Sequence, residues 1–352
     1  MLTAFRRLAV SASGLRRRGG QEPGEKLNGQ PTRRKPADKL AASKVDVRKL
    51  RRRLAPLESM LQPIASVEGR GRASGVLRYR LQLPLPPPGS GSPERLWLPE
   101  LVLQTHAKTY IPRILIEKGL ARYEDPALIH FMSVLDEAGD GAFLDIGANI
   151  GPYALLCAAL NGRTTVAFEP TPELAVLLRG SALDNGLDVR VESLAIGEAD
   201  GQASLHLSDV TDTSSSLNPS WRRSRASLSV PVLSVDSYCA RTDTVPAVLK
   251  IDTETTEPDV LRGAAGTVER YRPWILCEVL ASRGNAGEEV QEVVADWGYT
   301  YYHLAPDAGL IERPEIAGDR DHFMWLLAPR RLDESYRSRF EAWQRAFAQI
   351  QR

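Results

Sequence analysis

Short apolar runs and helix-like segments alternate along the chain from about residue 100 onward. The strand-like runs cover residues 143–146, 165–168, 189–191, 248–251 and 274–279. Helical patterns follow four of these runs and begin near Pro152, Pro172, Glu257 and Gly287. Such a repetition of strand and helix predicts an α/β fold with a mostly parallel, doubly wound sheet.

The C-terminal part departs from this repetition. Two further strand-like segments, 300–304 and 322–327, are joined by about 17 residues without a clear helical pattern. We therefore predict an antiparallel hairpin at the sheet edge, which makes the sheet seven-stranded. Residues 101–330 are expected to form the main domain, and residues 331–352 a helix with apolar side chains at helical steps.

The first hundred residues differ in pattern from the rest. Residues 1–38 are rich in Gly, Pro, Arg and Gln without apolar periodicity, so we expect a disordered basic tail. Leucines at helical steps over 39–62 predict an amphipathic helix. A strand at 75–83 and a proline-rich linker are expected within 63–100.

Charge is distributed unevenly between these regions. Residues 1–60 hold 16 Lys and Arg against 5 Asp and Glu, whereas the remainder holds 29 against 39. A basic arm of this kind can contact nucleic acid, an anionic surface or an acidic partner, but a solvated tail is the favoured interpretation. The five arginines among the first 20 residues also imitate a mitochondrial transit peptide.

Several protein classes are disfavoured by what the sequence lacks. No apolar run approaches the roughly 20 residues of a transmembrane helix. The three cysteines form no CxxC pair and the five histidines no HxH or HExxH pair, so we expect a reduced protein without a metal site. We expect a cytoplasmic location.

The most informative motif is the turn after the first core strand, Asp145 to Gly151. Ligands of open α/β sheets bind at the carboxyl ends of the strands, and Gly147 and Gly151 let the backbone approach a ligand closely. Asp145 can accept a hydrogen bond from an ammonium group. Asn149 and Gly151 break the GxGxxG spacing of a nicotinamide-binding turn. A purely structural turn is the alternative.

Two later strand ends add candidates for the same ligand. Glu169 ends the second strand, where a carboxylate can accept both ribose hydroxyls of an adenosine. The third strand ends near Ala195, where backbone groups and apolar side chains can frame the adenine, although an ordinary turn explains these residues equally well.

A second acidic strand end follows at 249–257. Asp252 and Glu254 lie two residues apart, so in a strand they face the same side. Together with Lys250 they are candidates to line a reaction site, where a carboxylate or lysine receives a proton. Glu257 is a further candidate, although an acid in a first helical turn is also favoured by the helix dipole.

These motifs, taken in order, resemble those of the FkbM-family methyltransferases over roughly residues 100–300. The matching segments are 145–151, 168–170, 185–186, 195–197, 215–217, 230–236, 250–252, Glu254, Glu257 and 260–263. The resemblance implies a Rossmann-like methyltransferase fold with S-adenosylmethionine as methyl donor. It also implies, commonly, O-methylation of hydroxyls on natural products or sugars, so the expected partner is a small-molecule or glycan acceptor.

The chain departs from the family pattern at one place. Thr255 and Thr256 stand where Gly and Ala are usual, and Pro258 follows Glu257. This departure bears on the acceptor more than on the cofactor. Two alternative functions stay open: a nicotinamide-dependent oxidoreductase, and a non-catalytic scaffold whose basic arm binds a partner.

Overall fold

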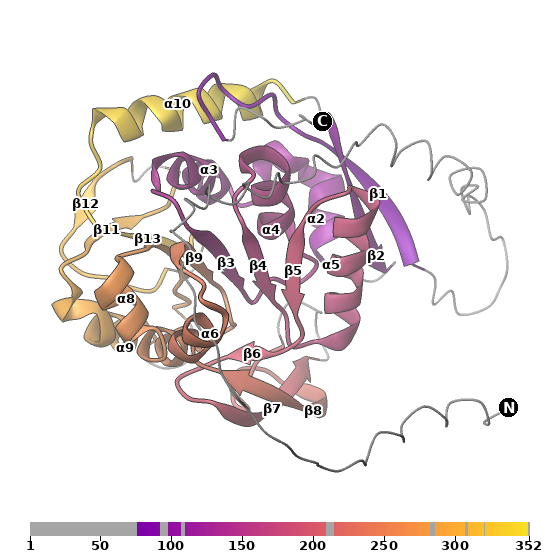
Figure 1. The fold of residues 1–352 in the computed structure, drawn as a ribbon, viewed down its shortest axis with the longest axis vertical. Helices are drawn as coiled ribbons and strands as arrows, with labels where there is room; N and C mark the ends of the chain where they lie inside the picture. Colours follow the sequence, from indigo (N-terminus) through magenta and orange to yellow (C-terminus); the bar gives the residue numbers. More distant parts are fainter. Residues whose placement is uncertain are drawn as a thin grey trace, which may run out of the picture. The chain divides into compact units, whose positions relative to one another are not determined.

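The computed structural model describes residues 76–91, 98–106, 110–208, 215–281, 286–306, 309–319 and 321–350 (Figure 1). The predicted disordered tail over 1–38, the predicted helix over 39–62 and the basic arm they form lie outside these residues. Among the described helices, none is both long and apolar enough to cross a membrane. The cysteines Cys157, Cys239 and Cys277 are buried and form no disulfide.

The central element is an eight-stranded sheet with the order β12-β11-β13-β10-β9-β3-β4-β5. Its strands are β3 (Ala142–Ile146), β4 (Thr165–Phe168), β5 (Val189–Glu192), β9 (Pro246–Ile251), β10 (Trp274–Glu278), β11 (Thr300–His303), β12 (Glu312–Arg313) and β13 (Met324–Ala328). All seven predicted strands are present, and the two-residue β12 adds an eighth at the edge.

The strand directions confirm the predicted mostly parallel sheet. β5, β4, β3, β9 and β10 pair in parallel, whereas β13 is antiparallel to both β10 and β11. β11 and β13 thus form the predicted antiparallel pair, with β13 inserted between β10 and β11. The order runs outward in both directions from β3 and β9, so the crevice for a ligand lies at the carboxyl ends of these strands.

Helices cover both faces of the sheet, because alternate residues of each strand point to opposite sides. Phe143, Val248 and Leu276 pack on the face covered by α3, α4, α5 and α10, and Leu144, Leu249 and Ile275 pack on the face covered by α6 to α9 (Figure 1). The helices of the first face are α3 (Ala127–Glu137), α4 (Pro152–Leu156), α5 (Pro172–Asp184) and α10 (Glu334–Ala348). Those of the second are α6 (Val235–Thr242), α7 (Glu257–Arg262), α8 (Ala265–Tyr271) and α9 (Ala286–Val294).

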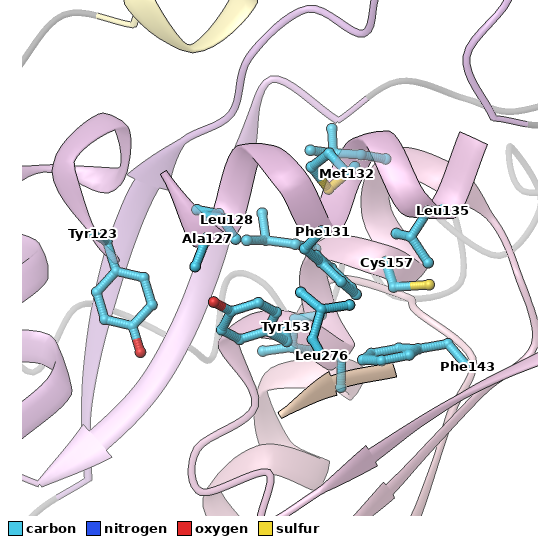
Figure 2. Close-up of a cluster of buried hydrophobic side chains, with 14 of the residues drawn as sticks. Tyr123, Ala127, Leu128, Phe131, Met132, Leu135, Phe143, Tyr153, Cys157 and Leu276 are labelled. Carbon is cyan, nitrogen blue, oxygen red and sulfur yellow. The ribbon is translucent and has the colours of Figure 1, made fainter. Parts of the chain in front are cut away.

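Aromatic packing on the first face fixes the position of the helices next to the glycine-rich turn. Phe131 of α3 lies between Phe143 of β3 and Tyr153 of α4, with ring centroids 4.8 Å apart in each pair (Figure 2). All three rings are buried. Tyr153 is therefore held rigidly beside the carboxyl end of the sheet.

Two smaller sheets complete the described part. β1 (Val76–Gln82), the predicted N-terminal strand, pairs antiparallel with β2 (Glu100–His106), which contacts α5. β6 (Ala195–Ile196), β7 (Gly201–Ser208) and β8 (Ser224–Leu233) form a three-stranded sheet. Between β2 and α3 lie α2 (Tyr110–Lys118) and a short 3₁₀ turn at Leu120–Arg122.

Candidate active site

A cavity of about 620 Å³ opens at the carboxyl ends of β3, β4, β9 and β10. Each of these strands contributes a residue at its end, namely Gly147, Glu169, Asp252 and Glu278. The walls are completed by the segment before α3, by β6 and β7, and by residues 215–217 and 221–222 before β8. The volume suits a ligand of cofactor size.

The turn after β3 needs glycine at two places. Gly147 has φ +79°, and a Cβ atom there would lie 1.8 Å from the Asp252 carbonyl oxygen. Gly151 has φ +83°, and its Cβ would lie 2.0 Å from Cδ1 of Leu178. Gly147 lines the cavity, whereas Gly151 lets α4 pack closely against α5.

The Glu169 carboxylate accepts hydrogen bonds from two backbone N–H groups, those of Asn149 and Thr171. The Asn149 N–H donates to Oε2 of Glu169 at 2.8 Å, and the Thr171 N–H donates to Oε1 at 2.7 Å. Asn149 itself is left-handed at φ +55°, and its Oδ1 accepts from the Ile150 N–H. Burial is the main reason that the pKa of Glu169 is raised to about 7. Each carboxylate oxygen keeps a further lone pair for a ligand hydroxyl.

Lys250 lies in a buried cluster of charges behind the cavity wall. Its Nζ is 2.9 Å from Oδ2 of Asp252 and 3.8 Å from Oδ1 of Asp145, and it lies 4.9 Å from the centre of the Tyr153 ring. Burial acts to lower the pKa of Lys250, but the Asp252, Asp145 and Glu124 carboxylates outweigh it and raise the pKa. With its pKa raised, Lys250 stays protonated, so it balances the charge of the carboxylates and does not act as the proton acceptor.

Asp145 is fully buried, and it is anchored on one side only. Its Oδ2 accepts from the Ala154 N–H at 3.0 Å, while its Oδ1 has no hydrogen-bond partner among the described residues. Burial raises the pKa of Asp145 to about 6, against the opposing charge of Lys250. Lys250, which lies between Asp145 and Asp252, thus orients Asp252 at the cavity wall, and Asp145, predicted to contact the cofactor, lies behind that wall.

The loop after β9 carries the other two predicted carboxylates to different places. Glu254 lines the cavity, and its Oε2 accepts from Trp221 Nε1 at 2.9 Å. Glu257 instead turns into the loop, where its Oε1 accepts from the backbone N–H groups of Thr253 and Thr255. Glu257 therefore supports the loop and does not line the cavity.

The backbone of this loop is strained at the position where the sequence departs from the family pattern. Glu254 has φ +57° and Thr255 has φ +84°, which is unusual for a β-branched residue. Hydrogen bonds from the segment before β8 stabilise this strained conformation. Ser216 Oγ donates to the Glu254 carbonyl, and Asn218 Nδ2 donates to Thr255 Oγ1. The loop thus adopts left-handed backbone at two consecutive residues without a glycine.

The cavity also contains residues that the sequence did not single out. Glu278 ends β10 beside β9 and is a third acidic strand end, a signal present in the sequence. Glu124 accepts from Tyr153 Oη at 2.6 Å, and Trp221 reaches the site from the segment before β8. Ala195 lines the cavity, and so does His322, whose carbonyl hydrogen-bonds with His303. The predicted contact of Ala195 with an adenine stays a prediction.

The sheet order and the cavity at its crevice define a Rossmann-like α/β domain with a candidate ligand site at the strand ends. Residues 145–301 match the family model described as the methyltransferase FkbM domain. This part of the chain is therefore similar to FkbM methyltransferase domains.

Solved structures show only distant similarity. An FkbM methyltransferase of Methylobacillus flagellatus KT is 16% identical with TM-score 0.36, and the match covers 53% of this chain and 43% of that one. A SAM-dependent methyltransferase of Agrobacterium tumefaciens is 9% identical with TM-score 0.36, covering 66% and 67%. The chain thus spans less than half of the length of the first of these proteins. No curated protein matches the sequence.

Proposed function

We propose that the chain transfers a methyl group from S-adenosylmethionine to a hydroxyl oxygen of a small-molecule or glycan acceptor. The observation that carries the proposal is the cavity at the carboxyl ends of β3, β4, β9 and β10, with Glu169 at one end and Asp252, Glu254 and Glu278 at the other. The family match over residues 145–301 supports methyl transfer as the reaction.

The residues present fit this cofactor. At the β4 end, Glu169 can accept from the ribose hydroxyls, and Ala195 lines the wall where an adenine would lie. At β3, the absence of a side chain on Gly147 keeps the cavity open beside the Asp252 carbonyl. Behind this wall, the buried Asp145 carboxylate accepts from the Ala154 N–H and lies near the Lys250 ammonium, so it supports the wall.

Charge supports a cationic ligand as well. Four carboxylates, Glu124, Asp145, Asp252 and Glu254, lie at or directly behind the wall between β3 and β9, and Lys250 is paired with two of them. S-adenosylmethionine supplies an electrophilic methyl group on a positively charged sulfur. An excess of carboxylates stabilises a cation bound beside them.

The chain's own residues then have three tasks. Glu169 and the Asn149 turn fix the orientation of the adenosine. Lys250 holds the Asp252 carboxylate in place. The segment before β8 covers the transfer end through Trp221 and positions Glu254, which limits the access of water. Alignment of acceptor and donor in this way is the main requirement for a direct displacement.

The test is to incubate the full-length protein with S-adenosylmethionine and a panel of sugars, nucleotide sugars and hydroxylated small molecules. We expect S-adenosylhomocysteine to form with at least one hydroxyl acceptor and not in the Glu169→Ala variant. Methylation confined to amine or thiol acceptors would contradict the hydroxyl assignment. Failure of the protein to bind S-adenosylhomocysteine would contradict the whole proposal.

A further inference from the structure

We propose that Glu278 is the catalytic residue that accepts the proton of the acceptor hydroxyl. This inference rests on the proposed function, since it assigns a role within the same cavity. Neither the sequence motifs nor the family match singles out this residue.

The sheet topology puts Glu278 at the transfer end of the cavity. The strands that line it run in the order β4-β3-β9-β10, and a ligand with its ribose at Glu169 extends past Gly147 toward β9. β10 pairs in parallel with β9, with Leu276 opposite Lys250 and Cys277 opposite Ile251. Glu278 therefore follows one step further, beside Asp252, where the acceptor would meet the methyl group.

Hydrogen bonding distinguishes Glu278 from the other carboxylates that line this end. Asp252 accepts from Lys250 and Glu254 accepts from Trp221. In Glu278, by contrast, the Oε2 atom is buried and has no hydrogen-bond partner among the described residues. A carboxylate that lacks hydrogen-bond donors is costly to ionise, and because Glu278 lines the cavity a bound ligand can supply a donor to it.

Asp145 has the second buried carboxylate oxygen of this kind near the site, but it does not line the cavity. Its free Oδ1 also lies 3.8 Å from the Lys250 ammonium, which offsets its charge. Among these described carboxylates, Glu278 both lines the cavity and has a buried oxygen without a hydrogen-bond partner.

The proposed step is a single displacement at the methyl carbon, with Glu278 as the proton acceptor. The acceptor oxygen forms a bond to the methyl carbon while the carbon–sulfur bond breaks and leaves its electron pair on sulfur. The hydroxyl proton passes to the Glu278 carboxylate, so the products are the methyl ether, the neutral thioether and a protonated Glu278. Burial, then the Asp252, Glu254 and Glu257 carboxylates, raise the pKa of Glu278 and make its carboxylate a stronger base. The positive charge of a bound sulfonium lowers this pKa, which favours the carboxylate form that accepts the proton.

The test does not require the acceptor to be known. Sinefungin carries an amino group on a carbon that replaces the methylated sulfur, so its ammonium occupies the place of the transferred methyl group. Binding of sinefungin and of S-adenosylhomocysteine is measured by calorimetry for the full-length protein and for Glu278→Gln, Glu278→Asp and Glu192→Gln. Glu192 is the matched control, because it ends the parallel strand β5 but does not line the cavity.

We expect the wild-type protein and Glu192→Gln to prefer sinefungin. In Glu278→Gln this preference should fall about tenfold, as for the loss of a charge-assisted hydrogen bond, with affinity for S-adenosylhomocysteine unchanged. Glu278→Asp should keep part of the preference. An unchanged preference in Glu278→Gln would overturn the assignment, and so would equal loss of both ligands in both Glu278 variants. If the wild-type protein binds neither ligand, the proposed function fails and the role of Glu278 falls with it.

Discussion

The two ends of the cavity stabilise their buried carboxylates in different ways. At the β3–β4 end, Glu169 receives backbone N–H groups on both oxygens, and the turn adopts left-handed backbone with glycine at Gly147. At the β9–β10 end, Glu254 and Glu278 lie among other carboxylates, and the left-handed backbone is carried by Glu254 and Thr255 without a glycine.

At the first end the carboxylate has its hydrogen-bond donors without a ligand, whereas at the second end the carboxylates lie close together and lack such donors in part. The first end is fixed by backbone hydrogen bonds, so it is preorganised for one ligand. The second end holds carboxylates whose pKa values are raised by burial and by their mutual repulsion. Such a site is stabilised when a cation or a hydroxyl donor enters it, and its chemistry depends on the acceptor.

The largest expected effect concerns the turn at the first end. Gly147→Ala should lower the free energy of unfolding by roughly 3–5 kcal/mol and abolish binding of S-adenosylhomocysteine, because the new Cβ overlaps the Asp252 carbonyl in left-handed backbone. Gly186→Ala is the control, since Gly186 has φ +64° but open space around it, and it should cost about 1 kcal/mol. Equal stability of the two variants in urea unfolding would refute the close approach.

Glu169→Gln is expected to weaken binding of S-adenosylhomocysteine by about 30- to 100-fold, because the variant loses charge-assisted hydrogen bonds to two ribose hydroxyls. Calorimetry measures this directly. Glu173→Gln, an exposed residue in the first turn of α5, should change the affinity by less than about twofold. Unaltered binding by Glu169→Gln would show that the adenosine does not lie at β4.

The pH dependence of stability should reveal the buried carboxylates. The pKa values of Asp145, about 6, and Glu169, about 7, lie above those of the unfolded chain, so the folded protein binds more protons. Their contribution is complete below the unfolded pKa and is lost as the pH rises through the folded pKa. The ligand-free protein should lose up to about 1.4 kcal/mol per pH unit for each group, between about pH 4 and 6 for Asp145 and between about pH 4.5 and 7 for Glu169.

A bound cation should offset this loss, so stabilisation by S-adenosylmethionine should grow across the same pH range. Urea unfolding at pH 5, 6 and 7, with and without the cofactor, measures both slopes. Stability of the ligand-free protein that rises with pH would contradict the pKa shifts.

The smallest effect is expected at the strained loop of the second end. Thr255→Gly relieves the strain at φ +84° but loses the bond from Asn218 and adds chain entropy, so stability should change by less than about 1 kcal/mol. Thr256→Gly relieves no strain, because Thr256 has an ordinary φ of −116°. It should therefore lower the free energy of unfolding by about 1 kcal/mol more than Thr255→Gly does. Thermal unfolding of both variants compares them; an equal cost would mean that Thr255 is not strained.

The sequence predicts the fold well where the pattern is local. β3, β4 and β9 are buried on both faces and therefore appear as continuous apolar runs, and Thr165–Phe168 has the predicted bounds. The insertion of β13 between β10 and β11 depends on pairing between distant segments, which no local pattern specifies.

The same contrast applies to the site. Glycines and acids directly after core strands place Gly147, Glu169 and Asp252 at the cavity from sequence alone. Glu124 and Trp221 come from loops whose position over the sheet depends on tertiary packing. The sequence also does not show that Glu257 turns into its own loop, because that orientation arises from the left-handed backbone at Thr255.

The most direct test of the account is a calorimetric titration of the full-length protein with S-adenosylhomocysteine and, separately, with NAD. We expect one binding site for S-adenosylhomocysteine, weakened by Glu169→Gln, and no binding of NAD. Binding of NAD in place of S-adenosylhomocysteine, or binding of neither, would contradict it.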